Sequence, residues 1–213
     1  IAPVVVDLNE RIHELAGKNI PIVYFDRPWR KDRYHVLNDN HRGVFEMTSA
    51  LIKAKRRPGF LGSFYRESNI TACERQQGYC EAMQMAGLPP RVLDCSHSTE
   101  KQDNELFGYE NVRWIIANQE VPDSLVCVTD AVALGAMRAL NNAGIMPGKD
   151  VLVTGHDNLR FSEFLTPSLT TIRQRKDLFA QTCISIIDAC LADKKPKEKG
   201  YVFTPEIIRR ESA

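Results

Sequence analysis

The chain has 213 residues, and its 28 Lys and Arg side chains nearly balance 27 Asp and Glu side chains, for a formal net charge of +1 at pH 7. Nucleic-acid surfaces concentrate positive charge, and no concentrated basic block occurs here, so we do not expect this chain to contact DNA directly. No apolar run approaches the ~20 residues that span a bilayer, and no charged region precedes a signal-like core at the start, so we expect a soluble protein.

Apolar and amphipathic runs alternate along the chain. Short apolar runs predict strands at residues 3–7, 20–26, 34–38, 58–63, 92–95, 124–129, 151–155, 169–173 and 201–203. Amphipathic runs predict helices at residues 8–18, 41–54, 72–86, 104–118, 131–143 and 176–192. This alternation is typical of βαβ units, so the sequence predicts an α/β fold with mainly parallel sheets. The units are too many for one comfortable sheet, and the polar segment 194–200 (KKPKEKG) suits a surface link, so we expect two lobes.

The cysteines give no sign of a metal site or of disulfide bonds. They are Cys73, Cys80, Cys95, Cys127, Cys183 and Cys190. None forms a CxxC motif, and no histidine is spaced to complete a zinc site, so no metal ligand is expected. Unpaired thiols that behave as small buried hydrophobes favour a reducing cytoplasm.

The motifs of the common α/β enzymes are missing. The sequence contains no GxGxxG after a strand, no GxxxxGK[ST], no GxSxG and no HExxH. We therefore predict no catalytic residue and no cofactor.

Polar and aromatic side chains follow the predicted strands directly, where open parallel sheets bind their ligands. They comprise carboxylates, hydroxyls and aromatic rings, namely Asp26, Trp29, Ser63, Phe64, Thr129 and Asp157. Carboxylates accept hydrogen bonds from hydroxyl groups, and aromatic faces cover the apolar side of a sugar ring. These residues are therefore candidate ligand contacts for a polyhydroxylated molecule.

Three of these positions have structural alternatives. Thr129 or Asp130 can cap the following helix; for Asp130 capping is favoured, and for Thr129 ligand contact. Asp26 can instead pair with a neighbouring arginine at the surface, and Trp29 can cover the core instead of a ligand.

Two neighbouring polar groups suggest other chemistry. His156 beside Asp157 has the composition of an acid–base dyad, although a lone pair of this kind is weak evidence of catalysis. The segment 38–41 (NDNH) has metal-ligand atoms, but helix capping explains it better.

Arg75 lies near the start of a predicted helix. Helix N-termini favour acids, so a cation there indicates a ligand or a carboxylate partner, with a solvated surface position as the alternative.

The predicted helix 131–143 (AVALGAMRALNNA) is apolar almost all round, which indicates burial on more than one side. It is either wholly inside the fold or part of a subunit interface shared with the segment 161–165 (FSEFL). The candidate interface residues are Leu134, Met137, Phe161, Phe164 and Leu165.

The phrase VTDAVALGAMRALNNAGIMPGKDVLVTGHDN, followed by PSLTTIRQ, resembles the effector-binding domain of the lactose/galactose repressor (LacI/GalR) family of bacterial transcription factors. The segments IPIVYFDR, ERQQGYCEAMQMAGL and PEIIRRESA extend the resemblance over essentially the whole chain.

The resemblance implies a type I periplasmic-binding-protein-like α/β fold, with two Rossmann-like parallel-sheet lobes joined by three crossings near residues 38–40, 173–176 and 199–201. The N-terminal lobe would hold residues 1–38 and 175–198 and be incomplete at its start. The C-terminal lobe would hold residues 39–174 and 199–213.

The resemblance also implies a function and a set of contacts. Asp26, Arg75, Thr129 and Asp157 would contact a small-molecule effector, with Thr129 standing where sugar-binding members often have Asn. The family's homodimer surface matches Leu134 and the segment 161–165. Operator DNA would be bound only through an N-terminal helix-turn-helix headpiece that this chain does not contain.

The sequence is thus expected to be the sugar-sensing, dimerising core of a cytoplasmic repressor, with a mono- or disaccharide between the lobes. A periplasmic sugar-binding protein of a transporter is the alternative. An α/β enzyme using His156 and Asp157 is a third possibility.

Overall fold

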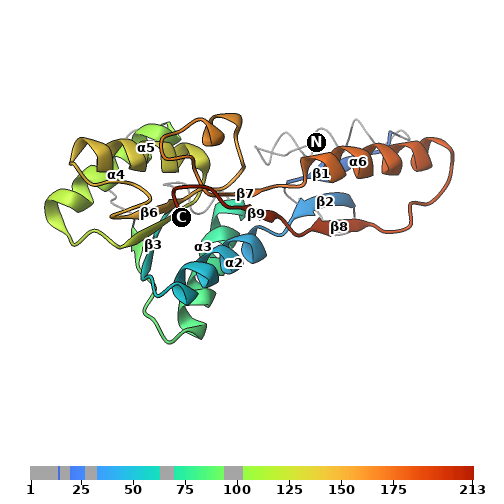
Figure 1. Ribbon diagram of the computed structural model, residues 1–213. Helices are drawn as coiled ribbons and strands as arrows, with labels where there is room; N and C mark the ends of the chain where they lie inside the picture. Colours follow the sequence, from blue (N-terminus) through green and yellow to red (C-terminus); the bar gives the residue numbers. More distant parts are fainter. Residues whose placement is uncertain (1–13, 15–19, 27–32, 63–69, 94–102) are drawn as a thin grey trace. The chain divides into compact units, whose positions relative to one another are not determined.

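The computed structural model describes residue 14 and residues 20–26, 33–62, 70–93 and 103–213 (Figure 1). The chain divides into two compact units that interleave along the sequence. Unit 1 comprises Ile1–Asp39 and Arg175–Thr204, and unit 2 comprises Asn40–Gln174 and Pro205–Ala213.

Unit 1 contains a small parallel sheet with one described helix packed against it. Its strands are β1 (Val23–Phe25), β2 (Tyr34–Asn38) and β8 (Gly200–Phe203), in the order β1-β2-β8. Helix α6 (Lys176–Leu191) buries Phe179 and Ile186 against Val23 and Val36. These apolar side chains form the core of this unit's described part.

Unit 2 is a four-stranded parallel sheet covered on both faces by helices. The strands are β3 (Pro58–Leu61), β4 (Val92–Leu93), β5 (Ser124–Cys127) and β6 (Leu152–Thr154), in the order β4-β3-β5-β6. The helices are α2 (Asn40–Lys53), α3 (Ile70–Met85), α4 (Asn104–Asn118) and α5 (Asp130–Asn142). Helices α4 and α5 lie on one side of the sheet, and α2 and α3 on the other (Figure 1). Strands β3 and β5 are buried along their whole length, as expected of a sheet covered on both faces.

A long connection and an antiparallel pair complete unit 2. The short 3₁₀ helix η1 (Arg160–Glu163) follows β6, and β7 (Thr171–Arg173) then pairs with β9 (Glu206–Ile208). Beyond β9, the fully buried Ser212 donates its hydroxyl to Val153 O at 2.6 Å and receives Thr170 N–H at 2.8 Å. The segment Pro205–Ala213 is therefore an integral part of unit 2 although unit 1 residues precede it.

Glycines allow α4 and α5 to pack in backbone contact. A Cβ atom on Gly135 would lie 1.9 Å from Glu105 O, and one on Gly108 would lie 2.1 Å from Val132 O. Because α4 covers one side of α5 and the sheet covers another, much of the apolar character of α5 is explained within the chain.

The predicted α/β fold with parallel sheets is confirmed, and the observed elements differ from the predicted ones mainly at their ends. The predicted strand 124–129 ends at Cys127, because Thr129 already caps α5. Strand β9 was not predicted, and the predicted strand 3–7 lies outside the described residues.

The third boundary between the units also differs from the expected one. We expected residues 199–213 to join the C-terminal lobe, but Gly200–Phe203 pairs with β2 of unit 1, so the division falls between Thr204 and Pro205.

The cysteines of the described residues are free thiols, as predicted. Burial raises the pKa of the Cys127 and Cys80 thiols, in keeping with small buried hydrophobes. Among the residues that the structure describes, no group of His, Cys, Asp and Glu is arranged to hold a metal ion. No helix in that part of the chain is long and apolar enough to cross a membrane.

Candidate functional site

A polar cluster lies in unit 2 where the strand order of the sheet reverses. The chain leaves β3 towards β4 at one edge, and leaves the adjacent β5 towards β6 at the other. In open α/β sheets this switch point, at the carboxyl ends of the strands, is where ligands bind. Arg75 of α3 reaches this position and donates from Nη1 to Val128 O, just beyond β5, at 2.8 Å.

Arg75 is a buried cation with several acceptors. Its side chain is 6% exposed, and besides Val128 O it reaches Asn40 Oδ1 through Nε at 3.0 Å and Asp157 Oδ1 through Nη2 at 3.4 Å. The prediction of a carboxylate partner is confirmed, and the solvated surface alternative is wrong. A buried guanidinium requires such partners because an uncompensated charge in the interior is costly.

Asp157 is the more exposed member of this ion pair, with a side chain 21% exposed. Its Oδ1 also accepts from Gln174 Nε2 at 2.7 Å and lies 3.1 Å from His156 Nδ1. The backbone of Asp157 has φ = 111°, outside the regions that non-glycine residues normally occupy. A partly exposed carboxylate fixed by a buried cation can accept O–H or N–H groups of a ligand.

Thr129, and not Asp130, caps helix α5. Thr129 has an extended backbone with φ = −144°, and its Oγ1 accepts Val132 N–H at 3.2 Å, so Thr129 is the N-cap of α5. The prediction that Asp130 caps this helix is therefore wrong. Asp130 is instead the first residue of α5, fully buried, and its carboxylate binds the segment that follows Asp157.

Sequence reasoning missed Asn40 and Gln174. Asn40 begins α2, accepts from Arg75 and donates from Nδ2 to Glu74 Oε2 at 3.1 Å. Gln174 directly follows β7, so the strand-end argument that found Asp157 would have found it as well.

The structure describes one more predicted ligand contact, Asp26. Asp26 lies in unit 1, follows β1 directly and has φ = 67°. Trp29, Ser63 and Phe64 lie outside the described residues.

Four of the five candidate interface residues are at least partly accessible. Phe164 is 71% exposed, and Leu134, Phe161 and Leu165 are half-buried. Met137 is only 3% exposed and packs in the core of unit 2, so this chain does not present it at its surface. We therefore remove Met137 from the candidate interface.

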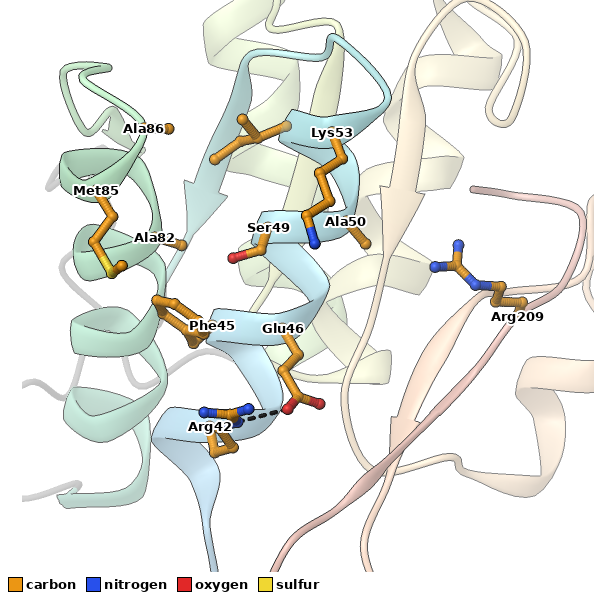
Figure 2. Close-up of a pocket in the computed structure, with 11 residues that line it drawn as sticks. Arg42, Phe45, Glu46, Ser49, Ala50, Lys53, Ala82, Met85, Ala86 and Arg209 are labelled. Atoms are coloured by element: carbon orange, nitrogen blue, oxygen red, sulfur yellow. Dashed lines mark hydrogen bonds and ion pairs between the residues drawn. The ribbon is translucent and has the colours of Figure 1, made fainter.

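A separate groove of about 750 Å³ lies between α2 and α3, in the helix layer that does not contain α5 (Figure 2). Apolar side chains such as Phe45 and Met85 line it, and the Arg42–Glu46 ion pair lies at its edge. It shares no lining residue with the Arg75–Asp157 cluster.

Comparison with known proteins gives a consistent picture. The family described as periplasmic binding protein-like domain matches residues 52–213. The HTH-type transcriptional repressor PurR of Actinobacillus pleuropneumoniae serotype 3 (strain JL03) is 29% identical over 92% of this chain and 58% of that protein. The protein of the same name in Haemophilus influenzae (strain PittEE) is 31% identical over 91% of this chain and 57% of that protein. The chain thus spans less than two thirds of the length of these relatives.

Solved structures agree with these sequence relatives. A regulatory protein of the LacI family from Chloroflexus aggregans is 26% identical with a TM-score of 0.82, over 95% of this chain and 72% of that one. The transcriptional regulator CelR in complex with cellobiose is 22% identical with a TM-score of 0.82, over 99% of this chain and 64% of that one. The Lac repressor dimer bound to operator and the anti-inducer ONPF is 22% identical with a TM-score of 0.79, over 97% of this chain and 60% of that one. At 22% identity, the last two show the fold alone.

Proposed function

Because the chain belongs to the LacI/GalR family and is the periplasmic-binding-protein-like effector-binding core of such repressors, we propose that it senses a small carbohydrate through the Arg75–Asp157 cluster. The whole protein would then be a cytoplasmic homodimeric repressor whose operator affinity changes when the sugar binds. DNA contact would come from a helix-turn-helix, because the repressors similar to this chain in sequence are named HTH-type.

The observation that carries this proposal is the partly exposed Asp157 carboxylate, held by buried Arg75 at the switch point of the sheet. Adjacent sugar hydroxyls can donate to a carboxylate, and the half-buried amide group of Gln174 adds a donor and an acceptor beside it. Pre-positioned polar groups of this kind discriminate ligands because any group left unpaired on binding costs free energy.

We propose Thr129 and Asp26 as further contacts. Thr129 is partly exposed, and a hydroxyl that accepts the Val132 N–H keeps its own hydrogen for a ligand oxygen. Asp26 follows β1 with a left-handed backbone, a conformation more common at functional sites than elsewhere. Trp29, Ser63 and Phe64 stay predictions that follow from their places after strands.

A sugar can regulate the protein only by binding one conformation better than another. A difference of ~1–3 kcal/mol in its affinity for two arrangements of the chain is a typical allosteric coupling. The operator affinity of the whole protein would change by the same factor, because coupling between two binding equilibria is reciprocal.

The test is a thermal-shift screen against mono- and disaccharides, with cellobiose as the first probe because CelR binds it in the same fold. Nucleobases and nucleosides form the comparison panel, since planar heterocycles also use carboxylate and amide partners. Calorimetry of the wild type and of Asp157→Ala then measures affinity for each hit. We expect the substitution to abolish sugar binding while the chain stays folded.

Asp150→Ala is the matched control, because this exposed acid accepts Met146 N–H in a turn and lies outside the cluster. Its affinity should equal that of the wild type. Unchanged affinity in Asp157→Ala would remove Asp157 from the site, and binding of heterocycles without sugars would overturn the carbohydrate assignment.

We also propose a homodimer through Leu134, Phe161, Phe164 and Leu165. These four apolar side chains, one on α5 and three in the connection after β6, are at least partly accessible, which suits the core of a subunit contact. Phe164→Glu should convert the dimer to a monomer in sedimentation equilibrium. Met85→Glu, on the separate groove of Figure 2, is an equally exposed control at 73% and should leave the mass unchanged.

The two rival functions have weaker support. The sequence relatives are transcriptional repressors, which does not favour a transporter's periplasmic receptor or an enzyme. Turnover of a sugar that is lost in His156→Ala would be needed to reinstate the enzyme.

A further inference from the structure

The carboxylate of Asp130 is fully buried at the first turn of α5 and binds three groups from one connection. Oδ2 accepts Leu159 N–H at 2.7 Å and the Ser162 hydroxyl at 2.6 Å, and Oδ1 accepts the Thr171 hydroxyl. All three donors lie between β6 and the first residue of β7. One side chain thus ties the whole connection to the helix.

Two contacts of Asp130 bracket the residues that turn the chain at the polar cluster. Its backbone N–H donates to His156 O at 2.8 Å, and its carboxylate accepts from Leu159. Between these contacts lie Asp157 and Asn158, with φ values of 111° and 47°. Non-glycine residues hold such conformations only where the surroundings enforce them, and the two contacts on either side supply that restraint.

Gly155 leaves room for this carboxylate. A Cβ atom on Gly155, directly before His156, would lie 2.2 Å from Asp130 Oδ1. The Thr171 hydroxyl, which donates to Asp130, also accepts Asn158 N–H at 3.3 Å. The turn is therefore held from both of its ends through one acid.

The same acid reaches the surface segment of the proposed dimer contact. Ser162 is fully buried within η1, and its neighbours Phe161 and Phe164 are accessible. Arg210 fixes the far side of the connection, donating to Asn158 Oδ1 at 2.8 Å and Leu169 O at 2.7 Å. Movement of Asp157 on ligand binding would therefore be transmitted to Phe161 and Phe164 through Asp130.

We propose that Asp130 is a positioning residue of the effector site, which holds the Asp157–Asn158 turn so that Asp157 meets Arg75, and which couples that turn to the 161–165 surface. This inference rests on the proposed function, since it names how occupancy of the same site reaches the subunit contact. Asp130 itself is buried and touches no ligand.

Burial raises the pKa of Asp130, and the hydrogen bonds from Ser162, Thr171 and Leu159 oppose this shift. An amide in place of the carboxylate could not accept from every donor at once, so Asp130→Asn should release part of the connection.

The first experiment needs no ligand. Hydrogen exchange of Asp130→Asn should be at least about tenfold faster than wild type at residues 157–165, because hydrogen bonds to a charged acceptor are lost there. Exchange in α2 and α3 should be unchanged. Asp150→Asn, which also removes a carboxylate acceptor of a backbone N–H, should leave residues 157–165 as in the wild type. Equal acceleration everywhere would reduce Asp130 to a general stabilising residue and overturn the proposal.

Milder variants keep the proposal testable if Asp130→Asn does not fold. Ser162→Ala and Thr171→Val each remove one donor to Asp130 and should give smaller, local increases in exchange. The side-chain amide resonance of Gln174, which donates to Asp157, should shift in these variants and not in Asp150→Asn. If exchange is faster but the Gln174 resonance is unchanged, Asp130 holds the connection without positioning Asp157, and the proposal is wrong.

The last experiment measures the affinity of the protein for cellobiose. A wild type that binds cellobiose should lose at least about tenfold in affinity in Ser162→Ala, measured under conditions where the variant is fully folded. If the wild type binds no sugar, the carbohydrate proposal fails, while hydrogen exchange and the Gln174 resonance still decide the role of Asp130.

Discussion

The Arg75–Asp157 ion pair makes a quantitative prediction about stability. At 3.4 Å, two unit charges attract by roughly 5 kcal/mol with an effective dielectric constant of about 20. The net value is smaller because Asp157 is 21% exposed and therefore partly hydrated. We expect Asp157→Asn to cost about 2–4 kcal/mol, since it leaves a buried guanidinium with neutral acceptors. Arg75→Met should cost a similar amount, because Asn40 and Val128 lose their donor.

The decisive measurement is the stability of the double variant that combines Asp157→Asn with Arg75→Met. If the pair is coupled, its destabilisation should fall short of the sum of the single effects by about 1–3 kcal/mol. Urea unfolding followed by the fluorescence of Trp114, in a Trp29→Phe background, reports on unit 2 through α4. Additivity within about 0.5 kcal/mol would show that the two charges do not stabilise each other, and the electrostatic account of the site would be refuted.

Three further predictions concern stability. Gly135→Ala should destabilise unit 2 by about 1–3 kcal/mol in urea unfolding, because the new methyl group meets Glu105 O of α4. In most helices the same change stabilises by about 1 kcal/mol. Burial raises the pKa of Tyr79 to about 12, so its phenol ionises first in the unfolded chain. The free energy of unfolding should therefore fall as pH rises from about 10 to about 12, by roughly 1.4 kcal/mol per pH unit. Tyr79→Phe should lack this part of the pH dependence, and equal slopes for both proteins would contradict it. Thr129→Ala should cost about 1 kcal/mol through the lost cap at Val132 N, whereas Thr129→Ser should restore most of it, as thermal unfolding would show.

Much of unit 2 could be predicted because its elements have strong local patterns. The apolar run of β5 is readable without its neighbours, as is Gly144, which has φ = 75° and follows the C-cap of α5. The strand-end argument located Asp157. Arg75 was found from a local electrostatic conflict, a cation near a helix start, which its carboxylate partner resolves.

The errors come from features that depend on distant residues. Thr129 and Asp130 have similar capping chemistry, and only the backbone at Thr129 decides which one caps α5. Apolar periodicity does not distinguish a core residue from an interface residue, so Met137 was placed in the wrong class. Strand β9 is three residues long and forms only through antiparallel pairing with β7, which no local pattern specifies.

The interleaving of the two units has a consequence for biosynthesis. Ser212 and β9 complete unit 2, yet the ribosome makes them only after α6 and β8 of unit 1. Val153 and Thr170 therefore wait for these partners while about thirty residues of another unit are synthesised between them. During this interval β7 lacks the partner strand that β9 later supplies, and unpaired strand edges of this kind are what make incomplete chains prone to aggregation.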